Sequence, residues 1–195
     1  DDDINEVIKV LKSDLITQGP IVQKFAKTIC TYTSSNYSVL TNSATSALHI
    51  ACLSLGLGKG DILWTSPNSY VASANVGLLC NAEIDFVDID PFNYNICIHA
   101  LSDKLKNAEK YGKLPKIVMP VHFAGQSCDM KAIKKLSKKY GFKIIEDASH
   151  AIGGKYLGYP IGSCKYSDIT VFSFHPVKII TCGEGGMALT NSYEI

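Results

Sequence analysis

The chain has 195 residues, 46% of them hydrophobic, which is enough for one sizeable buried core and typical of a single domain. Nineteen basic residues against 18 acidic ones give a net charge of +1. A chain this close to neutral has no overall positive electrostatic potential that would attract nucleic acid or an anionic membrane. No apolar run reaches the roughly 18 residues needed to cross a bilayer, and the acidic start at Asp1 is unlike a signal peptide.

The predicted elements alternate along most of the chain. An N-terminal helical segment is expected over residues 1–36, beginning with a helix at Ile4–Leu11. Seven strands are predicted at Tyr37–Leu40, Ile62–Thr65, Ile84–Asp88, Ile117–Val121, Lys143–Ile145, Ile169–Phe172 and Gly186–Thr190. Helices are predicted between them at Thr45–Leu55, Val71–Cys80, Ser102–Tyr111 and Met130–Tyr140. This alternation indicates an α/β domain over residues 37–195, with a mostly parallel sheet covered on both faces.

The segment Gly56–Gly60 has the glycine content of a dinucleotide-binding loop. It follows a predicted helix and precedes a strand, which is the reverse of that fingerprint. We therefore interpret it as a helix stop and turn. No glycine fingerprint follows the first strand, and this disfavours a nicotinamide-dependent oxidoreductase.

Reactive side chains follow the predicted strands at the places where open α/β sheets bind ligands. They occur at Thr41–Ser46, Ser66–Tyr70, His122, Glu146–His150 and Ser173–Lys178. One edge of the sheet is therefore expected to gather hydroxyls, an aromatic ring, carboxylates, imidazoles and an amine. The three histidines of this set lie after separate strands, which favours structural roles over a metal site.

The small residues Ser43, Ala44 and Thr45 precede a predicted helix. Free N–H groups and hydroxyls at a helix start form a cradle for phosphate. A plain helix cap explains the same residues, and taken alone it is the favoured interpretation.

Asp147 and Lys178 are the strongest chemical candidates. A carboxylate about 4 Å from a protonated pyridine nitrogen would contribute roughly 4 kcal/mol at an effective dielectric of about 20, which would keep that ring protonated as an electron sink. Lys178 is the one fixed cation in the run Val171–Ile180, and apolar neighbours would favour its neutral, nucleophilic amine. A loop aspartate bonded to backbone amides and a lysine reaching solvent are equally open alternatives.

The order of these motifs resembles the sugar aminotransferases of the DegT/DnrJ/EryC1/StrS family, over nearly the whole chain. The matching phrases are LITQGPIVQKFA, TNSATSALHIACLSLGLGKGD, TSPNSYVASANV, FVDIDP, PVHFAGQSCDM, IIEDASHAIGGKYLGYPIGS and SDITVFSFHPVKIITCGEGGMALTN. The resemblance implies a fold-type I pyridoxal-phosphate transferase large domain, with three α/β/α layers and a seven-stranded sheet. The phrase SFHPVK is most similar to the subgroup that makes UDP-4-amino-4,6-dideoxy-N-acetyl-β-L-altrosamine on the pseudaminic acid route.

The resemblance also implies a role for each site residue. Lys178 would be the Schiff-base lysine and the proton shuttle, and Asp147 would pair with the pyridine nitrogen. The rest of the implied set is His150 near the ring hydroxyl, Tyr70 stacked on the ring, Ser43, Ala44, Thr45 and Ser173 around the phosphate, and Thr17 and Gln18 near the nucleotide-sugar. Relatives that dehydrate their substrate have His in place of the lysine, so Lys178 favours amino transfer.

The implied reaction passes the amino group of L-glutamate to the C4 keto carbon of a nucleotide-linked 4-keto-6-deoxy sugar, with 2-oxoglutarate as the second product. The resemblance implies a homodimer, and a small C-terminal domain beyond Ile195. Seven cysteines without C-x-x-C pairs favour a reducing cytoplasm. We expect neither nucleic acid nor membrane as a partner. The alternative hypothesis is a non-catalytic or truncated module of the same fold that only binds or dimerises.

Overall fold

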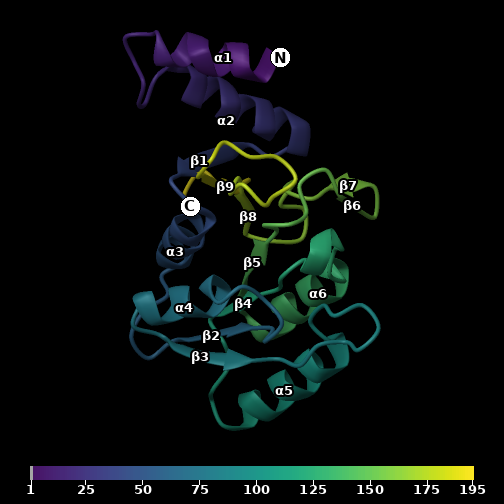
Figure 1. Ribbon diagram of the computed structural model, residues 1–195. Helices are drawn as coiled ribbons and strands as arrows, with labels where there is room; N and C mark the ends of the chain where they lie inside the picture. The colour runs from purple at the N-terminus through teal and green to yellow at the C-terminus, as the bar shows by residue number, and fades with distance from the viewer. Residues whose placement is uncertain (1) are drawn as a thin grey trace.

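The computed structural model describes residues 2–195, which fold around one seven-stranded sheet. The strands lie in the order β1-β9-β8-β5-β4-β2-β3 (Figure 1). Their bounds are β1 Tyr37–Thr41, β2 Ile62–Thr65, β3 Glu83–Phe86, β4 Ile117–Met119, β5 Lys143–Asp147, β8 Ile169–Ser173 and β9 Gly186–Thr190. Only β9 runs against its neighbours, pairing antiparallel with both β1 and β8. The predicted mostly parallel α/β sheet is confirmed.

The helices are α1 Asp2–Leu11, α2 Pro20–Thr33, α3 Ala44–Ser54, α4 Ala72–Leu79, α5 Ile98–Lys110 and α6 Met130–Tyr140. A short 3-10 turn at Phe123–Gly125 and a small hairpin, β6 Lys155–Tyr156 with β7 Tyr159–Pro160, complete the elements. The segment Gly56–Gly60 connects α3 to β2, as its interpretation as a helix stop requires. None of the helices over residues 2–195 combines the length and apolar character that a bilayer span requires.

Two elements were not predicted individually. The helix α2 begins with Pro20 after the N-cap Gly19, a favourable start, and carries Phe25 and Ile29 at helical spacing. The hairpin β6–β7 has strands of two residues, too short for any alternation to be visible in the sequence.

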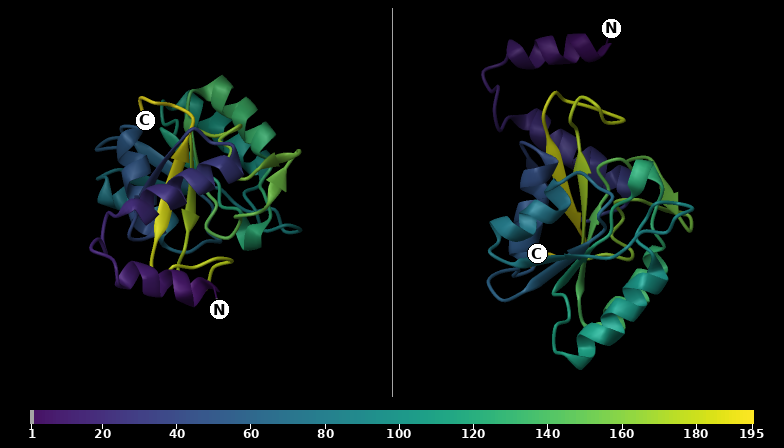
Figure 2. Two further views of the ribbon diagram at one scale, coloured as in Figure 1. Left: turned by 90° about the horizontal axis from the view of Figure 1, so that it is seen from above. Right: turned by 60° about the horizontal axis from the view of Figure 1, so that its bottom comes forward.

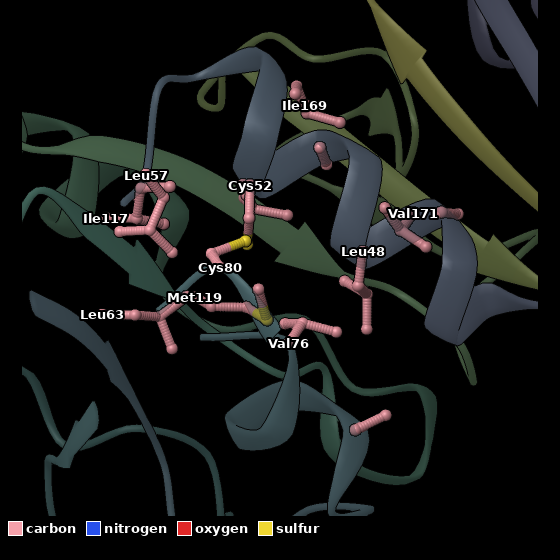
Figure 3. Close-up of a cluster of buried hydrophobic side chains, with 14 of the residues drawn as sticks. Leu48, Cys52, Leu57, Leu63, Val76, Cys80, Ile117, Met119, Ile169 and Val171 are labelled. Atoms are coloured by element: carbon pink, nitrogen blue, oxygen red, sulfur yellow. The ribbon is translucent and has the colours of Figure 1, made fainter. Parts of the chain in front are cut away.

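Alternate residues of each central strand point to opposite faces of the sheet, and this separates the helices into two layers. Leu63 and Ile117 pack against α3 and α4, where side chains from helices and sheet converge in one cluster (Figure 3). Their neighbours Trp64 and Val118 pack on the other face in a cluster with residues of α5 and α6. These two helical layers around the sheet form the expected three-layer fold.

The N-terminal helices differ in how they contact this body. The helix α2 joins the core through Ile29, which is 6% exposed and clusters with Phe172 and Phe174. The helix α1 lies beyond α2 at one end of the molecule (Figure 2) and has no buried residue. Its apolar residues Ile4 and Val7 are exposed.

Gly186 lets the strand β9 approach the start of α3. A Cβ atom at this position would lie 2.5 Å from the backbone nitrogen of Ala44 and would also overlap the backbone of Ser43. Only a residue without a side chain therefore fits between β9 and the turn that leads into α3.

We predict that Gly186→Ala lowers the free energy of unfolding by about 1–3 kcal/mol or more, because the new methyl group must displace backbone atoms. Urea unfolding monitored by circular dichroism measures this. Gly58→Ala is the matched control, since a Cβ there meets no atom within 4 Å. Equal unfolding midpoints for both variants would show that the close approach of β9 and α3 does not constrain the fold.

Candidate functional site

A pocket of about 610 Å³ lies where the carboxyl ends of the parallel strands meet, a volume in the usual range for ligand sites. Its walls come from the segments that follow β1, β2, β4, β5 and β8. The structure brings all eight predicted cofactor residues to this pocket: Ser43, Ala44, Thr45, Tyr70, Asp147, His150, Ser173 and Lys178. Ser43 and Lys178, which are 135 positions apart in the sequence, therefore share one cavity.

The two predicted sugar-binding residues lie elsewhere in this chain. Thr17 and Gln18 are exposed in the connection between α1 and α2, and neither is among the residues that line the pocket. Gln18 has a positive φ of 52°, so the connection turns sharply before α2. Their role near a nucleotide-sugar stays a prediction.

One end of the pocket is the N-terminus of α3. The Ser43 hydroxyl caps the helix by accepting a hydrogen bond from the Ser46 backbone nitrogen at 3.2 Å. The cap interpretation is therefore correct, but it leaves the first-turn N–H groups of Ala44 and Thr45 without an acceptor inside the helix. Ala44, Thr45 and Ser173 all line the pocket, so capping and anion binding are compatible.

Asp147 is the last residue of β5 and is 5% exposed. Its Oδ2 accepts a hydrogen bond from the Ser73 hydroxyl at 2.7 Å. Its Oδ1 accepts from the Ser149 hydroxyl at 2.6 Å and from the Ser149 backbone nitrogen at 3.2 Å. Within residues 2–195 no basic group forms an ion pair with this carboxylate. A buried anion surrounded by neutral donors is a strong site for a ligand cation.

Lys178 reaches the same pocket from the loop after β8. Its Nζ lies 2.7 Å from Nε2 of His150. Burial, followed by the positive charge of Lys178, lowers the pKa of His150 below its ordinary value. The imidazole is therefore neutral at pH 7, and its lone pair accepts a hydrogen bond from the lysine amine, which fixes the position of Nζ.

The sequence left two environments open for Lys178, an apolar, desolvating one and one in which the amine reaches solvent, and the structure of residues 2–195 does not enclose the lysine in apolar side chains. Lys178 is half-buried, while its neighbours Val177 and Ile179 are 77% and 65% exposed. The apolar residues of this loop point outward because the loop connects two strands beyond the edge of the sheet, with only one side against the pocket.

A second polar cluster lies on the opposite face of β5. The Glu146 carboxylate contacts Nε2 of His122 at 2.7 Å and accepts hydrogen bonds from Ser167 at 2.5 Å and Thr170 at 3.2 Å. The Cys128 backbone nitrogen donates to Nδ1 of His122, which leaves Nε2 as the protonated nitrogen facing Glu146. Burial opposes the charged carboxylate, but these three hydrogen bonds outweigh it and lower the pKa of Glu146.

Several pocket residues carried no assignment from the sequence. They are Asn68, Ser69, Ser149, Phe123 and Glu184 in the lining and Ser73 behind it. The spacing of Ser69 and Ser73, four apart on α4 and the turn before it, would place both hydroxyls on one face of a helix. Nothing in the sequence indicates that this face meets Asp147, since the two segments are 74 residues apart.

The comparisons with known proteins agree with this geometry. The sequence model of the DegT/DnrJ/EryC1/StrS aminotransferase family matches residues 1–195. The chain is 40% identical over 194 residues to a UDP-4-amino-4,6-dideoxy-N-acetyl-beta-L-altrosamine transaminase of Campylobacter jejuni, covering 99% of this chain and 50% of that protein.

Solved structures show the same fold. Helicobacter pylori PseC, an aminotransferase involved in pseudaminic acid biosynthesis, aligns with a TM-score of 0.91 and 33% identity, over all of this chain and 50% of that one. Bacillus subtilis NtdA with bound cofactor PMP aligns with a TM-score of 0.86 and 31% identity, over all of this chain and 43% of that one. The chain thus spans about half the length of the curated relatives it matches.

We predict that the His150 imidazole titrates below pH 6.5, because burial and the nearby Lys178 charge both oppose its protonation. Lys178→Met should raise this pKa partway toward 6.5, since burial remains while the charge is lost. Proton NMR of the imidazole signals measures it. Lys165→Met, which removes an amine lying over the Tyr159 ring, is the control and should leave His150 unchanged. An unchanged His150 pKa in Lys178→Met would contradict the contact.

We also predict a pH-dependent contribution of Glu146 to stability. Its folded-state pKa is lower than the ordinary 4.5, so the unfolded chain takes up the proton first as the pH falls. Glu146→Gln should cost about 1–3 kcal/mol at neutral pH, and the difference from wild type should shrink as the pH falls below 4.5. Urea unfolding at two pH values measures it.

The exposed Glu83 provides the control, because Glu83→Gln should change stability by less than about 0.5 kcal/mol at either pH. If Glu146→Gln lowers the free energy of unfolding by the same amount at both pH values, the folded protein does not stabilise the charged form of Glu146 relative to the unfolded chain.

Proposed function

The chain belongs to the DegT/DnrJ/EryC1/StrS aminotransferase family, and from this premise we propose that the whole protein is a pyridoxal-phosphate-dependent nucleotide-sugar aminotransferase. The observation that carries the proposal is the shared pocket of Lys178 and Asp147. A primary amine and a buried carboxyl group in one cavity supply the nucleophile that a pyridine aldehyde needs at one end and the hydrogen-bond partner that its ring nitrogen needs at the other.

The donor set of the pocket fits this cofactor. The N-terminus of α3 offers Ser43 and the free N–H groups of Ala44 and Thr45 for the phosphate, and Ser173 lies in the same lining. Asp147 would bind the ring nitrogen, and Tyr70, which lines the pocket while 74% exposed, has a face available for stacking on the ring. Lys178 would hold the aldehyde carbon.

Pyridoxal phosphate, when bound, supplies an aldehyde that exchanges amino groups and a ring that accepts electron density. Lys178 then acts through Nζ, taking a proton from the amino donor and returning one to the amino product. His150 would keep Nζ in place through its 2.7 Å contact. Asp147 would pair with the ring nitrogen and favour its protonated form.

The substrates we propose are L-glutamate, which would leave as 2-oxoglutarate, and a nucleotide-linked 4-keto-6-deoxy sugar that is aminated at C4. Support comes from the 40% identical Campylobacter jejuni transaminase and from Helicobacter pylori PseC at 33% identity. A role in making pseudaminic acid or a related cell-surface glycan follows from the same two relatives. Thr17 and Gln18 would contact the nucleotide-sugar in the complete site.

We further propose that residues 37–195 form the cofactor-binding large domain, with residues 1–36 as its helical extension, in a cytoplasmic homodimer. The exposed apolar residues Val177 and Ile179 beside the pocket are suited to burial against a second copy. The seven free thiols of the described residues are suited to a reducing compartment.

We predict that borohydride treatment of the whole protein with pyridoxal phosphate fixes the cofactor covalently to Lys178, because this amine alone among the pocket residues can bond an aldehyde. Peptide mass spectrometry locates the label. Lys178→Ala should bind cofactor without trapping it and should lose amino transfer from glutamate to the keto-sugar by at least about a thousandfold.

Lys165→Ala is the control and should keep both the label and the activity. A label on another lysine, or turnover retained in Lys178→Ala, would contradict the proposed role of Lys178. Normal trapping without conversion of the cofactor by glutamate would instead favour a non-catalytic binding module.

A further inference from the structure

We propose that Ser73 is a positioning residue that holds the Asp147 carboxylate toward the ring nitrogen of the cofactor. This inference rests on the proposed function, since it assigns a task to Ser73 within the same pocket. Ser73 lies in the first turn of α4, on the face of the sheet that Asp147 also meets.

The contact between Ser73 and Asp147 joins two separate elements. Ser73 is 1% exposed, and its hydroxyl lies 2.7 Å from Oδ2 of Asp147 across 74 positions of sequence. Ser149 binds the other oxygen, Oδ1, through its hydroxyl and its backbone nitrogen. Both carboxylate oxygens are therefore held, one by the local turn after β5 and one by α4.

The direction of the hydrogen bonds follows from the chemistry of the groups. An ionised carboxylate only accepts, so the single hydroxyl proton of Ser73 is used on Asp147. The Ser69 hydroxyl lies 2.8 Å from the Ser73 oxygen and must then be the donor in that pair. The result is a chain from Ser69 through Ser73 to Asp147 in which each bond polarises the next toward the carboxylate.

These hydrogen bonds orient the Asp147 carboxylate without pairing it with a basic side chain. Hydrogen bonds donated to a carboxylate stabilise the anion. They also leave its negative charge available to a cation, whereas a lysine or arginine at the same place would compete with a protonated ring nitrogen. Ser73 is therefore suited to fixing the direction of the carboxylate while leaving it free to pair with a cation.

A purely local role for Ser73 explains less of its geometry. A serine in the first turn of a helix commonly bonds a nearby backbone group, and Ser73 lies 3.3 Å from the Tyr70 carbonyl oxygen. The Asp147 contact is 0.6 Å shorter and involves a charged acceptor, so it is the stronger of the two.

The test compares two ligands in the whole protein: pyridoxal phosphate, and its carbocyclic analogue in which a CH group replaces the ring nitrogen. Ser73→Ala should raise the dissociation constant of pyridoxal phosphate about 5- to 20-fold, because Asp147 loses one of the donors that fix it. The analogue lacks the ring nitrogen, so its dissociation constant should change less than about twofold. Absorbance titration measures both constants.

Two further variants separate positioning from packing. Ser73→Thr keeps the hydroxyl and should restore most of the lost affinity for pyridoxal phosphate. Ser137→Ala removes another buried serine hydroxyl, which bonds the Phe142 carbonyl oxygen at 2.6 Å on the other face of the sheet, and should affect neither ligand.

Equal losses for both ligands in Ser73→Ala, or no loss for either, would overturn the inference and leave the proposed function intact. Wild-type protein that binds neither compound would instead contradict the proposed function, and the inference would fail with it.

Discussion

Two adjacent carboxyl groups at the end of β5, Glu146 and Asp147, are both buried, and the rest of the site depends on how each is hydrogen-bonded. Because neighbouring strand residues face opposite sides of a sheet, Glu146 and Asp147 enter different environments. Glu146 is enclosed by His122, Ser167 and Thr170, and so connects the segment after β4 and the start of β8 to β5. Asp147 is held by neutral hydroxyls and faces the pocket. One strand end thus supplies both a structural anchor and a reactive charge.

The sequence predicted the sheet and the location of the pocket well. Strand β2, strand β9 and helix α6 have the bounds that hydrophobic periodicity indicated, because each is a short segment with a clear pattern. The pocket could be predicted because the carboxyl ends of parallel strands meet at one edge, which brings Asp147 and Lys178 together whatever the connecting helices do. The family prediction from the motif order is also confirmed.

The remaining features depend on contacts between distant segments, which local patterns do not encode. The Ser73 contact with Asp147 and the Glu146 contact with His122 each join separate elements. The apolar run around Lys178 indicated burial, but periodicity cannot tell which surface a loop will face, and Val177 is exposed in this chain. The Lys178 loop and α1 both present apolar side chains outward.

The central claim is that the Lys178 amine and the Asp147 carboxylate serve opposite ends of one aromatic ring. A crystal structure of the whole protein with pyridoxal phosphate tests it most directly. The account predicts continuous electron density from Nζ of Lys178 to the cofactor, and a hydrogen bond of about 2.7–2.9 Å between the ring nitrogen and Asp147. A cofactor bonded to another lysine, or a ring nitrogen directed away from Asp147, would contradict it.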